Sequence, residues 1–128
     1  MCGPGARFKL WKGNKIVKKI LIQYKPDLLV IEELFFAKNA STAMLVGQAR
    51  GVILLTAIQK GLAIKEFTPL QVKQALTGYG RAEKNQIQKM VALTLQLPEK
   101  KLQDDAADAL AIAITCGASL AFLQKTKK

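Results

Sequence analysis

The chain has 128 residues, half of them hydrophobic, with 20 Lys or Arg against 9 Asp or Glu. This length suits one domain with its own core, and the absence of His excludes a histidine general base or a histidine metal ligand. The net charge of +11 favours a polyanionic partner, with nucleic acid ahead of an anionic membrane. Solvated lysines on an ordinary soluble protein would give the same count.

The apolar runs are interrupted by Lys or Gln well short of the ~20 residues that cross a bilayer. The first residues mix Gly, Pro, Arg and Lys, which is unlike a secretory signal. Cys2 and Cys116 are too few for a disulfide framework or a zinc site. We therefore expect a soluble, cytoplasmic, single-domain protein over residues 1–128, with no membrane partner and a basic tail at residues 124–128.

Residues 7–24 have helical spacing that is weakened at Gly13-Asn14, and Pro26 ends this helix. The apolar run over residues 27–31 has the length of a strand covered on both faces. Glu32 follows at once. A carboxylate at the end of a buried strand is a frequent active-site position, and equally the solvated start of a loop, so both interpretations stay open.

Ser41 or Thr42 can cap a helix that runs to about residue 60. Its small residues, Gly47 and Gly51 among them, permit close packing inside the protein or across a dimer seam. Residues 62–67 predict a second strand, after which Thr68-Pro69 has the form of a helix start.

A short helix then ends near the turn at residues 78–81, which is glycine-bearing, aromatic and basic through Arg81. The next helix covers about residues 82–97 and is expected to bury Ile87, Met90, Val91 and Leu95. A turn of this kind at a helix N-terminus suits a phosphate, while an ordinary helix–helix loop is the plainer interpretation.

The last helix opens with three aspartates in an alanine-rich stretch. Asp105 and Asp108 are three residues apart and project from the same side of a helix. With Glu32 they could hold two divalent metals for phosphodiester hydrolysis. The alternative is that Asp104 caps the helix and Asp105 complements its dipole, which leaves Asp108 unexplained.

Several segments, taken together and in order, carry a resemblance to a known family. They are IEELFFAKN at 31–39, GQARG at 47–51, FTP and QVKQA at 67–75, GYGRAEK at 78–84, and DDAADALAIAI at 104–114. The chain resembles the RuvC family of Holliday junction resolvases from about residue 16 to 116.

The resemblance implies an α/β, RNase H-like fold and Mg²⁺-dependent paired nicking of four-way DNA junctions in recombination and repair. Glu32, Asp105 and Asp108 look like catalytic and metal-binding carboxylates, with two Mg²⁺ per site that Mn²⁺ could replace. The helix with Gly47 and Gly51 corresponds to the family's dimer-forming region. The resemblance also implies a homodimer that works with the RuvA–RuvB branch-migration machinery.

The resemblance also assigns DNA contacts. Phe35 matches an aromatic residue that enters the junction centre, where a ring can stack on bases. Lys73 and Lys84 match lysines near the scissile phosphate, and Arg81 is the basic residue of the glycine turn.

The sequence departs from the family at its N-terminus. Members begin with a strand bearing a fourth catalytic Asp, followed by two more strands, whereas this chain has no Asp or Glu before Asp27. We expect helices packed on a reduced sheet and impaired cleavage, from a truncated resolvase or a natural degenerate member. The alternative function is a non-catalytic basic module that binds branched or single-stranded nucleic acid.

Overall fold

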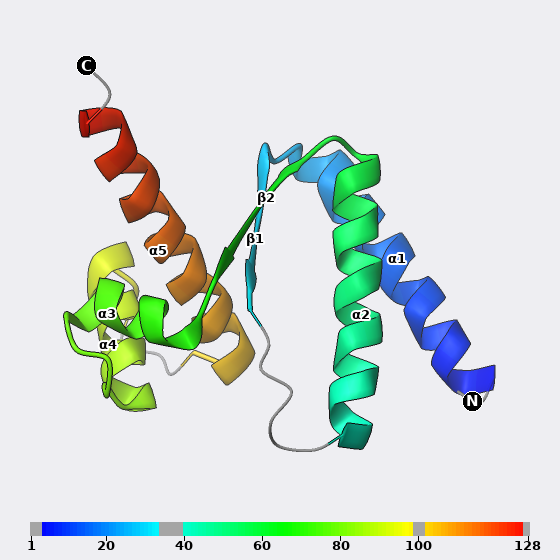
Figure 1. The fold of residues 1–128 in the computed structure, drawn as a ribbon, viewed down its shortest axis with the longest axis horizontal. Coiled ribbons are helices and arrows are strands. Elements are labelled where there is room, and N and C mark those ends of the chain that lie inside the picture. Colours follow the sequence, from blue (N-terminus) through cyan, green and yellow to red (C-terminus); the bar gives the residue numbers. More distant parts are fainter. Residues whose placement is uncertain (1–3, 34–39, 99–101, 127–128) are drawn as a thin grey trace. The chain divides into compact units, whose positions relative to one another are not determined.

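The computed structural model describes residues 4–33, 40–98 and 102–126. Its elements alternate helix, strand, helix and strand before three helices end the chain (Figure 1). They are α1 (Pro4–Tyr24), β1 (Leu28–Glu32), α2 (Ala40–Gln59), β2 (Ala63–Phe67), α3 (Pro69–Thr77), α4 (Lys84–Leu95) and α5 (Asp104–Thr126). The predicted element order is confirmed.

Contacts divide the chain into two compact units. The first unit comprises Met1–Leu29 with Leu34–Lys65, and the second comprises Val30–Glu33 with Glu66–Lys128. The division passes through both strands.

In the first unit, α1 and α2 lie side by side (Figure 1). The amide Nδ2 of Asn14 donates a hydrogen bond to Thr56 Oγ1 at 2.7 Å, and that hydroxyl donates to the carbonyl oxygen of Val52 at 2.7 Å. Thr56 is fully buried, so the pair satisfies a polar group that would otherwise be costly to enclose. Helix α1 therefore continues through Gly13-Asn14, where propensity alone predicted a weak point.

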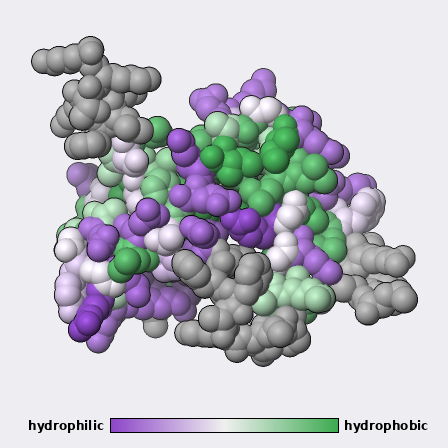
Figure 2. All heavy atoms as spheres, in the orientation of Figure 1, coloured by the Kyte–Doolittle hydropathy of each residue, from purple (hydrophilic) through white to green (hydrophobic). Residues whose placement is uncertain are grey.

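Much of α2 remains exposed although its residues are largely apolar, and Figure 2 shows hydrophobic side chains gathered over it. Met44, Leu45, Leu55 and Ile58 are each more than half exposed. Within α2, Thr42–Gln59 is long and apolar enough to cross a membrane by length and composition, a test that helices of soluble proteins also pass. The sequence expectation of no such stretch was therefore too strict.

The two strands pair in parallel. The amide of Ala63 donates to the carbonyl oxygen of Asp27 at 3.4 Å, and the amide of Glu33 donates to the carbonyl oxygen of Phe67 at 2.8 Å. Residue numbers rise together along both strands, and α2 provides the crossover that a parallel pair requires. This register places Glu32 at the carboxyl end of β1, one residue before the bond to Phe67.

Two predicted helix boundaries in the second unit are confirmed by their caps. Thr68 accepts a hydrogen bond from the amide of Gln71, and the Gln71 side chain accepts one from the amide of Thr68. This reciprocal capping box, with Pro69 at the first helical position, starts α3. Gly78 ends α3 in the left-handed conformation, with φ 73°.

The turn after α3 is tightly packed at its second glycine. A Cβ on Gly80 would lie 2.6 Å from Cδ1 of Leu70, so any side chain there would force Leu70 to move. The Thr77 hydroxyl also accepts a hydrogen bond from the amide of Tyr79. Packing and local hydrogen bonds therefore account for this turn.

The hydrophobic core of the second unit lies among α3, α4 and α5. Its buried members are Leu76, Ala82, Ile87, Val91 and Ala111. Small residues on α5, Ala107 and Ala111, are 1% exposed and let that helix approach its neighbours closely. The predicted burial of Ile87 and Val91 is confirmed, and Met90 is packed against the core. Leu95 is 40% exposed at the end of α4, so its predicted burial is wrong.

Candidate active site

The three predicted catalytic carboxylates all belong to the second unit. Glu32 is the last residue of β1, while Asp105 and Asp108 lie in the first two turns of α5. All three are exposed. The spacing of the aspartates on a regular helix places both on one side of α5, as the sequence predicted.

Glu32 and Asp108 interact electrostatically. Partial burial raises the pKa of Glu32 above its ordinary value, and the negative charge of Asp108 raises it further. Two carboxylates that repel each other in this way favour a bound proton or cation between them. The strand carboxylate of Glu32 therefore lies within electrostatic reach of Asp108, the third aspartate of α5.

The oxygen ligands of this pair have the chemistry that Mg²⁺ and Mn²⁺ prefer. Among the described residues, however, no three His, Cys, Asp or Glu side chains lie close enough to form a metal site. The carboxylates thus fit a divalent cation by their charge and their oxygen atoms. Glu32 and Asp108 interact with each other, and Asp105 is close to Asp108 in sequence, but the three do not form a complete set of metal ligands.

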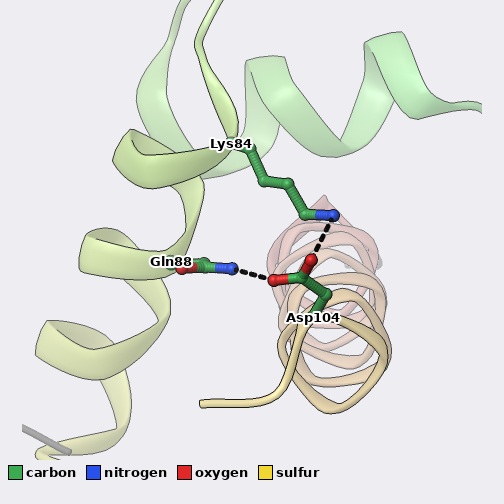
Figure 3. A network of polar contacts seen from close by, with 3 residues as sticks. All are labelled: Lys84, Gln88 and Asp104. Atoms are coloured by element: carbon green, nitrogen blue, oxygen red, sulfur yellow. Dashed lines mark hydrogen bonds and ion pairs between the residues drawn. The ribbon is translucent and has the colours of Figure 1, made fainter. Parts of the chain in front are cut away.

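A polar network joins α4 to the start of α5 (Figure 3). The Lys84 ammonium forms an ion pair with Asp104 Oδ2 at 3.1 Å. The Gln88 amide Nε2 donates a hydrogen bond to Asp104 Oδ1 at 3.0 Å. Lys84 and Gln88 are one helical turn apart on α4, so both reach the same carboxylate. Asp104, the first residue of α5, therefore links that helix to α4, while its predicted capping role stays a prediction.

This network also gives Lys84 its electrostatic setting. The hydrogen bond and the charge of Asp104 raise the pKa of Lys84, and the charges of Asp108 and Asp105 act in the same direction. Lys84 is therefore a fixed positive charge beside the aspartates of α5. Both members of the ion pair are largely exposed to solvent, so a phosphate oxygen can exchange for Asp104 at little cost.

The remaining predicted DNA contacts are more dispersed. Lys73 is half-buried on α3, and Arg81 is exposed in the turn before α4. Both belong to the second unit. Phe35 lies outside the described residues.

Sequence reasoning missed Gln88 entirely and assigned Asp104 only a cap. The signal was available in part, since Lys84 and Gln88 stand four residues apart on a predicted helix. Nothing in the sequence, however, indicates that this helix face meets the first residue of α5.

The parallel β1–α2–β2 unit is followed by three helices. One carboxylate lies at the end of β1, and others lie at the start of α5. This arrangement defines an α/β protein of the RNase H-like class. A sequence profile described as "Crossover junction endodeoxyribonuclease RuvC" matches residues 7–116. The chain belongs to the RuvC family.

Proteins with the same description are close in sequence. The one from Caldicellulosiruptor saccharolyticus is 61% identical over 95 residues, covering 74% of this chain and 57% of that protein. The one from Roseiflexus sp. is 58% identical over 98 residues, covering 77% of this chain and 58% of that protein. The chain thus spans somewhat more than half the length of these curated relatives.

Solved structures agree with this placement. The Thermus thermophilus RuvC structure matches with a TM-score of 0.84 and 33% identity, covering 94% of this chain and 74% of that one. T. thermophilus RuvC in complex with Holliday junction substrate matches with a TM-score of 0.81 and 35% identity, covering 89% of this chain and 70% of that one. The predicted family and fold class are confirmed.

Proposed function

We propose that this chain carries most of a structure-selective endonuclease that resolves four-way DNA junctions by paired nicking during recombination and repair. The observation that carries the proposal is the 35% identity and TM-score of 0.81 to a RuvC solved with Holliday junction substrate. The setting of the carboxylates supports it, because Glu32 and Asp108 interact and Lys84 stands beside α5.

Glu32, Asp105 and Asp108 would hold the divalent cation, Mg²⁺ or Mn²⁺, in this proposal. A two-metal site supplies an activated water and stabilises the leaving oxygen. Partial burial and the nearby charge of Asp108 raise the pKa of Glu32, and a bound cation would offset the cost of keeping that carboxylate charged.

Lys84 would contact the phosphate next to the cut and offset its charge, exchanging Asp104 for a phosphate oxygen. Lys73 and Arg81 would hold the DNA backbone further along, and Phe35 would stack at the junction centre. Such backbone contacts predict strong salt dependence of binding.

The exposed apolar residues of α2 support a homodimer in which this helix meets its copy. Two active sites related by a two-fold axis suit a four-way junction, which has the same symmetry. The proposal further places the protein in the cytoplasm, acting with the RuvA–RuvB branch-migration machinery.

The direct test is cleavage of a mobile four-way junction by the purified chain in Mg²⁺, with a linear duplex as competitor. Junction-selective nicking that disappears in Asp108→Asn and in Glu32→Gln supports the proposal. Equal cleavage of both DNAs would instead indicate a nuclease without junction preference.

Junction binding without cleavage calls for a second experiment, because the family resemblance implies a fourth catalytic carboxylate on an opening strand, and residues 1–26 contain no Asp or Glu. Fusion to the opening strands of the C. saccharolyticus relative should raise cleavage strongly. If the fused protein binds junctions, does not cut them, and is indifferent to Glu32→Gln, the chain is a non-catalytic basic module.

A further inference from the structure

Helix α1 and its immediate surroundings have an unusual concentration of positive charge. Residues 1–26 contain seven Lys or Arg and no Asp or Glu, which accounts for +7 of the net charge of +11. The proposed cleavage site in the second unit uses none of these residues. This part of the chain therefore needs an explanation of its own.

Three lysines lie together on one side of α1. Half-buried residues recur at helical spacing on the side that meets α2, where Asn14 bonds to Thr56. At about 100° per residue, Lys12, Lys15 and Lys19 fall within roughly 60° of one another on the opposite side. All three are exposed, and Lys18 is exposed beside them.

An aromatic ring lies within this surface. Trp11 is 52% exposed, and the Lys15 ammonium stands over its ring, 4.0 Å from the centroid. This contact holds the Lys15 ammonium against one face of the indole. We call Trp11, Lys12, Lys15, Lys18 and Lys19 the α1 basic face.

We propose that the α1 basic face binds the phosphate backbone of a duplex arm of the DNA, separately from the cleavage site. Lys12 and Lys19 are seven residues apart, about 10 Å along the helix, so the surface can meet more than one phosphate. Clustered, solvent-exposed ammonium groups hold counterions, and their release drives binding to a polyanion. The proposal takes its partner from the proposed function.

The geometry predicts recognition of charge rather than of junction shape, because lysine ammonium groups contact the backbone without reading bases. The α1 basic face should therefore contribute equally to binding of four-way junctions and of linear duplexes. Selectivity for the junction would come from other contacts.

The test compares two triple variants that remove the same charge. Lys12→Gln/Lys15→Gln/Lys19→Gln alters the α1 basic face, while Lys60→Gln/Lys65→Gln/Lys89→Gln removes three exposed lysines elsewhere. Binding of four-way and linear DNA is measured without divalent metal at several salt concentrations, after circular dichroism confirms folding.

We expect the α1 triple variant to reduce the slope of log K against log salt by about 2–3, and the control by less than one. At 0.1 M salt the α1 variant should bind both DNAs roughly ten- to hundredfold more weakly. Equal losses in both triples, or a loss confined to the junction, would overturn the proposal.

A second measurement uses the unmodified chain, because Trp11 is its single tryptophan. Titration with linear duplex should change the intrinsic fluorescence with the same midpoint as binding. A constant signal at saturation contradicts the proposal, as does a response to phosphatidylserine vesicles but not to DNA. Cleavage of junctions with an unresponsive Trp11 would reject only this inference, whereas failure of the fused protein to cut rejects the proposed function.

Discussion

The two units of this protein differ in how completely they enclose their own side chains. The second unit has a closed core of Leu76, Val91 and their neighbours on three helices. In the first unit the buried described residues are Thr56 and Ala57, while large apolar side chains of α1 and α2 remain exposed. The predicted active-site carboxylates belong to the unit with the larger closed core, and most of the exposed large apolar side chains of the described residues belong to the other.

The largest expected effect tests whether the chemistry is confined to the second unit. Asp108→Asn should lower junction cleavage by more than about 100-fold, since loss of a group that only hydrogen-bonds to a metal ligand already costs roughly 10–100-fold. Asp27→Asn in the first unit makes the same chemical change and should leave the rate nearly unchanged. The cleavage rates are measured in the fused protein if the chain alone does not cut. Comparable losses of rate in both variants would show that the chemistry is not confined to the second unit.

The next prediction tests the closed core. Val91→Ala should lower the free energy of unfolding by about 2 kcal/mol, because Val91 is 0% exposed and the truncation leaves a cavity. Leu93→Ala on the same helix is the control, since Leu93 is largely exposed and should cost far less. Urea unfolding measures both, and similar losses would contradict the described packing.

A smaller effect is expected where the first unit does have an interior. Thr56→Val keeps the side-chain volume but leaves Asn14 Nδ2 without its acceptor, so we expect a cost of about 1–2 kcal/mol. Thr56→Ser retains the hydroxyl and serves as the control. If Thr56→Val is neutral in urea unfolding, α1 and α2 are held together by something other than this bond.

Glu32→Gln should stabilise the metal-free protein slightly. Because the folded-state pKa of Glu32 is raised, folding favours the protonated form, and stability falls as pH rises from the ordinary glutamate pKa through the folded one. The variant should therefore gain less than about 0.5 kcal/mol at neutral pH, and nothing at pH 3. Thermal unfolding in EDTA at both pH values measures this, and a gain at pH 3 alone would reverse the assigned sign.

The smallest effect is expected at Asp104. Asp104→Asn removes the carboxylate that occupies Lys84, so metal-free binding of junction DNA should strengthen by about threefold, without loss of stability. In a Lys84→Gln background the same change should alter binding less, which isolates the pair. Equal gains in both backgrounds would show that Asp104 acts only through general repulsion of DNA.

The sequence predicted the order of elements because strong local signals mark them. The apolar run before Glu32 and the Thr68-Pro69 start are examples, and the structure has a strand and a helix at these places. It also placed Asp105 and Asp108 on one helix side. Local patterns could not give the contact of Asp104 with Lys84 and Gln88, because it depends on how α4 and α5 pack.

The exposure of Leu95 and the continuity of α1 through Gly13-Asn14 escaped prediction for a related reason. Helical periodicity shows which residues share a face, but not where the neighbouring helix ends. Asn14 looks like a helix breaker until Thr56, forty-two residues later, accepts its hydrogen bond. Long-range partners decide both cases.

The glycine turn at residues 78–81 combines two positions that the fold fixes with two that it leaves free to vary. Gly78 is held by its left-handed conformation and Gly80 by the nearness of Leu70, so neither glycine needs a phosphate to explain it. Tyr79 and Arg81 between and after them have exposed side chains. Substitution of Tyr79 and Arg81, in evolution or by design, can therefore change what this turn binds without changing the fold.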